Sequence, residues 1–302
     1  MTKTAWGWNN DTFAVTSPAG RHILRISANA DRTEVEFEHE VLSRLAALAS
    51  LPFATPLPLR SIGGATVEPF ETDRGQRPAT LFPVIPGRHP DDGQTDAVAA
   101  GAAAFGELDR VLATIEIAGP TPPTNTGLAS ISRSVPTLAG IEDAIGDEAA
   151  ALVRAVSDET AELVRSLPQQ LIHHDFALGN VLLDGTTVVG ILDFEFCGVD
   201  VRANELAGAL GLVITKTTAD QLWRPVLAAY LRALPLGDDE RRALPALTRL
   251  SRAAGLVWWV GRERQGLSSK TDTAERIERL LSIDAWVTRN ADELVETALA
   301  AG

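Results

Sequence analysis

The sequence predicts an α+β protein of two lobes, a small β-rich lobe with one helix and a larger, mainly helical lobe. Three observations support this fold class. A chain of 302 residues is long enough for two lobes. Short apolar runs bounded by turn residues, which are typical of strands, dominate before residue 86, and helical spacing dominates after residue 95. We therefore expect one lobe at 1–85, the other at 86–302 and a hinge at about 81–89.

Strand patterns and one helix account for the small lobe. Residues 12–16 and 22–26 are typical of two strands, because the Ser-Pro-Ala-Gly sequence between them is a turn signal. A helix follows at 35–48, where apolar residues recur at helical spacing. Residues 62–65 and 79–85 indicate another hairpin. The two prolines and one glycine of the hinge segment disfavour a helix there.

Long helical patterns fill the larger lobe. They lie at 97–115, 141–167, 203–214, 219–234, 238–261 and 273–300. One segment interrupts them, because residues 171–194 alternate apolar runs with turns, and Asp184-Gly185 between two such runs is a strong hairpin signal. We therefore predict a β-hairpin inside the helical lobe, with polar residues at both ends.

The composition excludes several classes of protein. Forty acidic against 27 basic residues give a net charge of −13, whereas proteins that bind nucleic acid or anionic lipid present basic patches. The single cysteine, Cys197, excludes an intrachain disulfide and a cysteine-rich zinc site. No apolar run approaches the ~20 residues that span a bilayer, and the first eleven residues lack a signal-peptide core. We expect a cytoplasmic monomer or homodimer without nucleic-acid or membrane partners, and its acidity suits a cationic substrate.

Polar residues gather around the predicted hairpin. His173 and Asp175 precede it. Because a hairpin brings its ends together, Asn180 at its start and Asp193 at its end should lie close. Their oxygens suit Mg²⁺, which keeps water and substrate phosphates as its other ligands. Asp175 would then be free to receive a proton from an attacking hydroxyl, so the pattern indicates phosphoryl transfer.

These residues resemble the catalytic core of the aminoglycoside phosphotransferase, choline kinase and homoserine kinase group. The similar sequence is His173-x-Asp175-x₄-Asn180, followed by Ile-Leu-Asp193-Phe-Glu195. The group consists of small-molecule kinases with a protein-kinase-like fold. The resemblance implies that Asp175 is the catalytic base, that His173 braces the catalytic loop, and that Asn180 and Asp193 hold Mg²⁺. Glu195 stands where protein kinases carry glycine, a variant of choline-kinase-like and homoserine-kinase-like members.

The resemblance extends into the small lobe. Residues 7–13 are similar to the family's short phosphate loop, which makes Asn9 and Asn10 candidates for contact with the nucleotide. Arg25 falls where the family has a Lys or Arg that contacts the nucleotide phosphates. The single lysine of this lobe, Lys3, lies near the terminus and does not compete for that role.

Two further features of the small lobe match the family. Glu40, on the predicted helix, resembles the glutamate that pairs with the cation at position 25, and Glu36 one turn away is the alternative. Phe82 and Val84 lie in the segment that resembles the hinge, whose backbone would hydrogen-bond adenine. The resemblance therefore implies ATP as the phosphoryl donor, with GTP as the alternative, and Mg²⁺ as the metal.

The resemblance leaves the acceptor open. Asp109 stands where many members have a histidine, and Glu205 stands where they usually have aspartate. The last ninety residues match no specific motif. The acceptor is expected to be an amino alcohol or homoserine-like metabolite, or an aminoglycoside or cationic peptide antibiotic. Trp258 and Trp259 fit either the core or the wall of a cation-binding pocket.

Two rival functions belong to other classes. One is a nucleotide-binding pseudokinase with a regulatory role, which the intact Asp175, Asn180 and Asp193 argue against. The other is a helical interaction module of unrelated fold, which an absent thermal shift with ATP and Mg²⁺ would favour. The sequence therefore predicts an ATP-dependent O-phosphotransferase, and metal-dependent turnover would separate it from both rivals.

Overall fold

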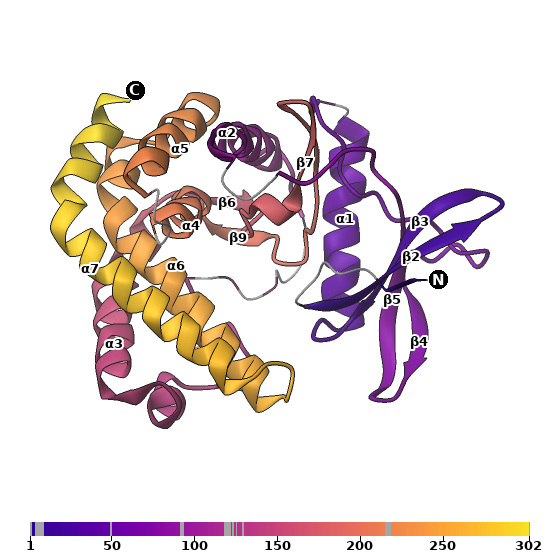
Figure 1. Ribbon diagram of the computed structural model, residues 1–302, viewed down its shortest axis with the longest axis horizontal. Helices are drawn as coiled ribbons and strands as arrows, with labels where there is room; N and C mark the ends of the chain where they lie inside the picture. Colours follow the sequence, from indigo (N-terminus) through magenta and orange to yellow (C-terminus); the bar gives the residue numbers. More distant parts are fainter. Residues whose placement is uncertain are drawn as a thin grey trace.

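The computed structural model describes residues 2–3, 9–48, 50–90, 94–117, 122, 124, 126–128, 130–214 and 219–301. Within these residues the chain forms a sheet with one helix, followed by a mainly helical part (Figure 1). The sheet lies on one side of helix α1 (Arg32–Leu48), and the helical part lies on the other side. The predicted α+β fold class is confirmed.

Five antiparallel strands form the sheet, in the order β1-β2-β3-β5-β4. Their bounds are Thr2–Lys3 (β1), Asn10–Ser17 (β2), Gly20–Ser27 (β3), Glu68–Thr72 (β4) and Gly75–Pro83 (β5). The predicted turn at 17–20 connects β2 and β3, which pair along their full length. The predicted strand at 62–65 is wrong, because these residues form a turn in which Gly64 has a φ of 87°.

Helix α1 begins at a capping box. Asp31 Oδ1 accepts the backbone N–H of Glu34 at 3.0 Å, and Glu34 Oε2 accepts the backbone N–H of Asp31 at 2.8 Å. The buried face of α1 combines apolar and polar residues, namely Val35, Glu38, His39, Val41, Leu42 and Leu45. Its glutamate reaches Arg25 of β3, so this face of the helix is directed at the sheet.

Six α-helices form the helical part in the described residues, as predicted. Their bounds are Thr95–Leu112 (α2), Glu142–Ser166 (α3), Ala203–Ile214 (α4), Ala219–Ala233 (α5), Asp238–Arg264 (α6) and Lys270–Ala300 (α7). α6 packs against α3, α4 and α7, and α2 packs against α5. In the part of the chain that the structure describes, no helix has the length and apolar character needed to cross a membrane.

Two small antiparallel sheets lie within the helical part. Their strands are Gln169–Ile172 (β6) paired with Gly198–Val201 (β9), and Val181–Asp184 (β7) paired with Thr187–Ile191 (β8). β7 and β8 form the predicted hairpin, and Gly185 in its turn has a φ of 61°. The backbone N–H of Leu192 donates to the Asn180 carbonyl at 2.8 Å, so the two ends of the hairpin lie side by side.

Candidate active site

The loop after β6 is held by the fully buried side chain of His173. Its Nε2 donates to the Leu192 carbonyl at 3.0 Å, and its Nδ1 accepts the backbone N–H of Asp175 at 3.3 Å. The ring lies edge-on to Phe105 and Phe194, with centroids 4.9 and 4.6 Å away. Burial lowers the pKa of His173 to about 3, so the ring is neutral at physiological pH. His173 therefore ties the loop that carries Asp175 to the end of the hairpin.

Asp175 is held in place by Asn180. The Nδ2 of Asn180 donates to the Asp175 backbone carbonyl at 3.0 Å and to Asp175 Oδ2 at 2.7 Å. Burial raises the pKa of the Asp175 carboxyl, and the hydrogen bond from Asn180 acts in the opposite direction. Because the nitrogen of the Asn180 amide is used in this way, its Oδ1 is the atom left to bind a metal ion.

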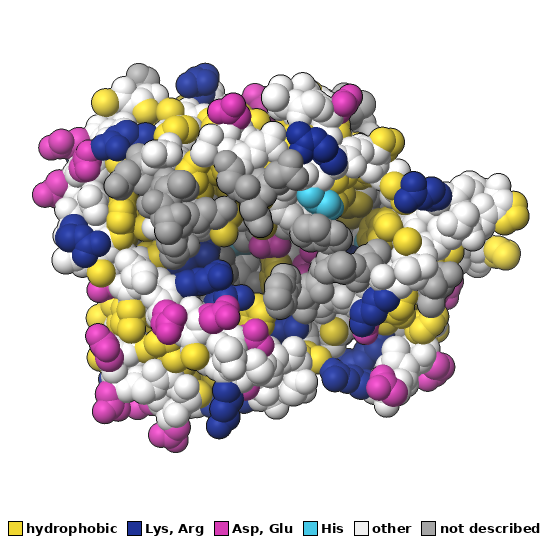
Figure 2. All heavy atoms as spheres, viewed as in Figure 1, with side chains coloured by type: hydrophobic (Ala, Val, Ile, Leu, Met, Phe, Trp, Pro, Cys, Tyr) yellow, Lys and Arg dark blue, Asp and Glu magenta, His cyan; other side chains and the backbone are white. Residues whose placement is uncertain are grey.

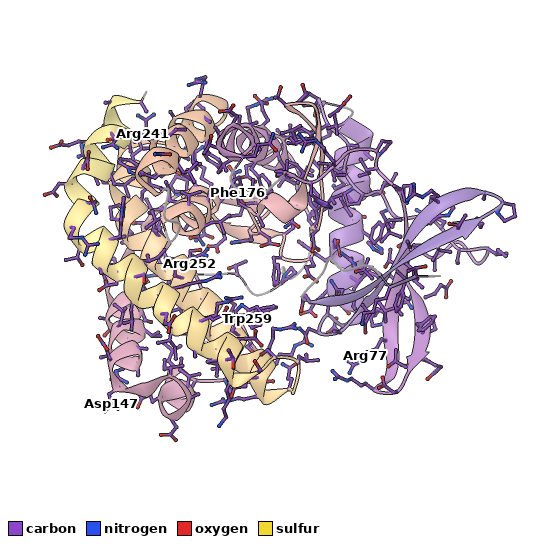
Figure 3. The ribbon with its side chains drawn as sticks, in the orientation of Figure 1. Arg77, Asp147, Phe176, Arg241, Arg252 and Trp259 are labelled. Atoms are coloured by element: carbon purple, nitrogen blue, oxygen red, sulfur yellow. The ribbon has the colours of Figure 1, made fainter. Side chains whose placement is uncertain are left out.

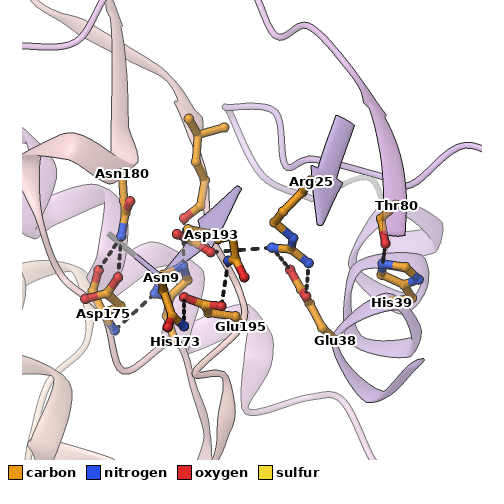
Figure 4. A network of polar contacts seen from close by, with 12 residues as sticks. Asn9, Arg25, Glu38, His39, Thr80, His173, Asp175, Asn180, Asp193 and Glu195 are labelled. Atoms are coloured by element: carbon orange, nitrogen blue, oxygen red, sulfur yellow. Dashed lines mark hydrogen bonds and ion pairs between the residues drawn. The ribbon is translucent and has the colours of Figure 1, made fainter. Parts of the chain in front are cut away.

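Asp193 and Glu195 follow the hairpin and meet residues of the sheet. Asp193 has a φ of 63°, a left-handed conformation that is uncommon for non-glycine residues and concentrates at functional sites. Glu195 accepts hydrogen bonds from Asn9 Nδ2 at 2.7 Å and from Asn10 Nδ2 at 2.8 Å. Figure 4 shows these contacts linking the sheet to the segment after the hairpin. The structure thus brings the two predicted asparagines to this site, and residues 7–8 of the predicted phosphate loop lie outside the described residues.

Arg25 forms a buried bidentate ion pair with Glu38. Its Nη1 lies 2.9 Å from Glu38 Oε1, and its Nη2 contacts Glu38 Oε2. The same Nη1 lies 3.5 Å from Asp193 Oδ1. Burial alone would lower the pKa of Arg25, but the charge of Glu38 and the hydrogen bonds to it outweigh burial and raise the pKa. Arg25 is therefore a fixed positive charge beside Asp193.

Glu40 does not pair with Arg25, so this prediction is wrong. Glu40 is exposed and forms an ion pair with Arg44 of its own helix, and the alternative Glu36 is exposed as well. The reason is the helical geometry, since a shift of two residues turns a side chain by about 200° around the axis. Glu38 lies on the apolar stripe of α1, which is the signal that identifies the correct glutamate.

The predicted hinge residues Phe82 and Val84 lie at the end of β5. Phe82 is buried, and the guanidinium of Arg25 lies over its ring, 5.0 Å from the centroid. The N–H of Val84 donates to the Arg21 carbonyl in a long hydrogen bond of 3.4 Å. The Phe82 side chain therefore supports Arg25, and contact between this backbone and adenine stays a prediction.

The two departures from the family pattern, Asp109 and Glu205, hold the catalytic loop from the protein interior. Asp109 accepts the backbone N–H of His173 at 3.3 Å and the hydroxyl of Tyr230 at 2.7 Å. Burial raises the pKa of Asp109 to about 8. Glu205 accepts the backbone N–H of His174, and burial, followed by the charge of Asp109, raises the pKa of Glu205. Both departures therefore have a structural role in this chain.

The oxygen atoms around Asp193 suit a divalent cation. Burial, followed by the charge of Glu195, raises the pKa of Asp193, and a cation would relieve this repulsion. Among the described residues, no group of three or more His, Cys, Asp or Glu side chains is placed to hold a metal ion. The candidate ligands at this site are Asn180 Oδ1 and the Asp193 carboxylate. This pair fits Mg²⁺, which would take water and phosphate as its other ligands.

A cavity of about 470 Å³ lies beside Asp175, in the hollow visible in Figure 2. Its walls come from the loop before α1, the segment 130–133 and helices α6 and α7. Trp258 and Trp259 line this cavity, and most of the Trp259 side chain is buried. The cavity is large enough for a small molecule, and a ligand within it would reach the Asp175 carboxylate.

Comparisons with known proteins agree with this geometry. A family model described as the phosphotransferase enzyme family (APH) matches residues 1–247. A homoserine kinase from Methylobacillus flagellatus is 27% identical over 265 residues, which cover 85% of this chain and 77% of that protein.

Two solved structures share the fold. The microcompartment-associated aminopropanol kinase has a TM-score of 0.75 at 18% identity, and the match covers 99% of this chain and 94% of that one. An amicoumacin kinase, solved with AMP-PNP, Ca²⁺ and Ami, has a TM-score of 0.68 at 17% identity, with 98% and 87% covered. The predicted protein-kinase-like fold is confirmed.

Proposed function

Because this chain belongs to the phosphotransferase enzyme family, we propose that it is a kinase that transfers the γ-phosphoryl group of ATP to a hydroxyl of a small molecule. The observation that carries the proposal is the position of Asp175, whose carboxylate lines the cavity and is held by Asn180 at 2.7 Å. The similar proteins are a homoserine kinase, an aminopropanol kinase and an amicoumacin kinase, which supports a small hydroxylated acceptor.

Asp175 would orient the acceptor hydroxyl and take its proton during the transfer. A bond forms between the acceptor oxygen and the γ-phosphorus. The bond between the γ-phosphorus and the oxygen that bridges it to ADP breaks, and its electron pair leaves with ADP. Asn180 fixes the direction of the Asp175 carboxylate before the acceptor arrives, and His173 positions the loop without touching either reactant.

The nucleotide would lie between the sheet and the hairpin. Arg25, fixed by Glu38, is placed to bind phosphate oxygens. Asn180 and Asp193 would hold Mg²⁺, which when bound neutralises charge on the phosphates. The hinge at about 81–89 would connect the two lobes and bind adenine through its backbone, with GTP as the alternative donor.

Asp175→Asn tests the proposed base. ADP release is measured with ATP and Mg²⁺ across homoserine, choline, ethanolamine, aminopropanol and several aminoglycosides. We expect stimulation by an acceptor, and a loss of about 10²- to 10⁴-fold in kcat for Asp175→Asn while ATP binding changes little. Asp184→Asn, an exposed carboxylate of the same hairpin, is the matched control and should keep the wild-type rate.

Two results would contradict the proposal. Turnover of Asp175→Asn near the wild-type rate would show that another group accepts the proton. Binding of ATP and Mg²⁺ without turnover of any acceptor would favour the regulatory pseudokinase instead.

A further inference from the structure

The cavity beside Asp175 is rich in arginine, although the chain has a net charge of −13. The charged residues in its wall are Arg133, Arg252, Arg262, Arg276 and Arg279, against Glu34, Asp175 and Glu195. Figure 2 shows dark blue side chains at the edge of the hollow on the side of α6 and α7, and Figure 3 shows Arg252 and Trp259 extending from α6. The charge that a ligand meets here is therefore opposite in sign to the charge of the whole chain.

The other carboxylates of the cavity wall already have partners. Glu34 pairs with Arg133 at 3.0 Å, and Glu195 accepts hydrogen bonds from two asparagines of the small lobe. Asp175, the proposed base, accepts one side-chain hydrogen bond from the described residues, that of Asn180 to Oδ2, which leaves its Oδ1 for a ligand. The cavity thus holds no cluster of open carboxylates, among the described residues, of the kind that a polycationic acceptor requires.

The tryptophans of the cavity are covered by the chain's own arginines. The guanidinium of Arg262 lies over Trp258 at 4.8 Å from the ring centroid, and that of Arg276 lies over Trp259 at 4.3 Å. Each ring therefore already has a cation against one face. This arrangement argues against these tryptophans as a binding site for a cationic ligand.

Arg252 has an incomplete set of partners. Its Nη2 donates to the Gly208 carbonyl at 3.3 Å and to Ser251 Oγ at 3.1 Å, both neutral oxygens. Among the described residues, its buried Nε has no hydrogen-bond partner, and no carboxylate forms an ion pair with the guanidinium. The side chain runs along Gly211 of α4, where a Cβ atom would come within 2.8 Å of Nε. The packing of α4 and α6 therefore leaves room for this guanidinium without neutralising it.

Arg279 adds a second positive charge. It lies on α7, lines the same cavity, and has no hydrogen bond or ion pair with any described residue. Burial, followed by the charge of Arg279, lowers the pKa of Arg252 to about 10. The charge of Arg276 also lowers this pKa, whereas the charge of Asp175 raises it. An oxyanion that contacts both guanidiniums would replace this repulsion by charge-assisted hydrogen bonds.

We propose that the acceptor carries an oxyanion, either a carboxylate or a phosphate monoester, and that Arg252 and Arg279 bind it. The inference rests on the proposed function, because Asp175 must act on a hydroxyl of the same molecule. Arg252 and Asp175 line one cavity of about 470 Å³, so the acceptor is a compact hydroxylated acid. The cationic acceptor expected from the net charge is therefore disfavoured.

Calorimetry with four probes tests the inference, on protein loaded with Mg²⁺ and a non-hydrolysable ATP analogue. 4-Hydroxybutanoate carries a carboxylate and glycerol 3-phosphate carries a phosphate, whereas 3-aminopropan-1-ol and kanamycin carry amines without an oxyanion. We expect one oxyanion probe to bind more tightly than both amines. Its affinity should fall about 10- to 100-fold in Arg252→Gln, the loss typical of a hydrogen bond to a charged group. Which of the two binds identifies the oxyanion.

Arg242→Gln is the matched control, because Arg242 is an exposed residue of the same helix, and it should leave binding unchanged. Arg279→Gln, at another exposed position, provides the same test if Arg252→Gln does not fold. Tighter binding of an amine, or oxyanion binding that both cavity variants leave unchanged, would overturn the inference. Failure of both oxyanion probes to bind at millimolar concentration would overturn it too.

Turnover of the same probes separates this inference from the proposed function. Turnover of an amine that Asp175→Asn abolishes would leave the kinase in place and refute the oxyanion site. Oxyanion binding that depends on Arg252, without turnover of any acceptor, would retain the anion site and refute the kinase.

Discussion

Arg25 in the sheet and Arg252 on α6 both have a buried Nε, yet their surroundings are opposite. Arg25 forms a bidentate ion pair with Glu38, and this carboxylate raises its pKa in spite of burial. Arg252 donates to neutral oxygens, and burial together with the charge of Arg279 lowers its pKa. Within the part of the chain that the structure describes, one guanidinium has a carboxylate partner and the other has none.

The difference separates two tasks of one active site. An arginine that is paired in advance keeps its position whether or not the nucleotide is bound, because its partner is part of the chain. An arginine without a carboxylate partner gains the most from an anion that arrives with a ligand, since that anion relieves a buried charge. We infer that the first arginine serves the nucleotide and the second selects the acceptor.

Removing the carboxylate that pairs with Arg25 should have the largest effect on stability. Glu38→Gln leaves Arg25 buried without its carboxylate, which we expect to lower the free energy of unfolding by about 3–5 kcal/mol. Glu40→Gln, on the exposed face of the same helix, should cost less than about 1 kcal/mol. Urea unfolding of both variants measures the two losses, and a larger loss in Glu40→Gln would refute the assignment of the partner.

Asp109 extends the comparison to a buried acid. It has no cationic partner among its hydrogen bonds to described residues, and the raised pKa indicates that it is buried in its protonated, neutral form. Its pKa rises from 3.8 to about 8, so the folded protein binds a proton that the unfolded chain releases. Stability contributed by this group is therefore present at low pH and is lost as the pH rises toward 8. The groups that face it are Tyr230, the backbone of His173 and the carboxyl of Glu205.

Asp109→Asn should remove this pH dependence. Between about pH 6 and pH 8 the wild type should lose about 2 kcal/mol of unfolding free energy relative to the variant. Urea unfolding at the two pH values measures the difference. If the difference in unfolding free energy between wild type and variant stays constant with pH, Asp109 is ionised in the folded state.

The centre of the site could be predicted because its chemistry is local in the sequence. The turn at Asp184-Gly185 sets the register of β7 and β8, and this register alone places the ends of the hairpin together. Asn180 and Asp193 could therefore be identified as neighbours from their spacing in the sequence. The partner of Arg25 could also have been identified. That identification depends on which glutamate lies on the apolar stripe of α1, and simple spacing along the chain is not enough.

The acceptor side could not be predicted in the same way. Arg252 and Arg279 lie on two different helices, and they line one cavity because of how α6 and α7 pack. Periodicity predicts each helix but not the rotation of one helix against the other. The net charge pointed to a cationic acceptor, because a sum over the whole surface carries no information about the wall of one cavity.

The most direct test of the account is a matched pair of conservative variants, Arg25→Lys and Arg252→Lys, in steady-state kinetics with the acceptor found by the ADP-release panel. Each variant keeps a positive charge and loses the planar fork of the guanidinium. We predict that Arg25→Lys raises the KM for ATP about tenfold and leaves the KM for the acceptor nearly unchanged, and that Arg252→Lys does the reverse. Variants that both raise the same KM would contradict the division of the two arginines between nucleotide and acceptor.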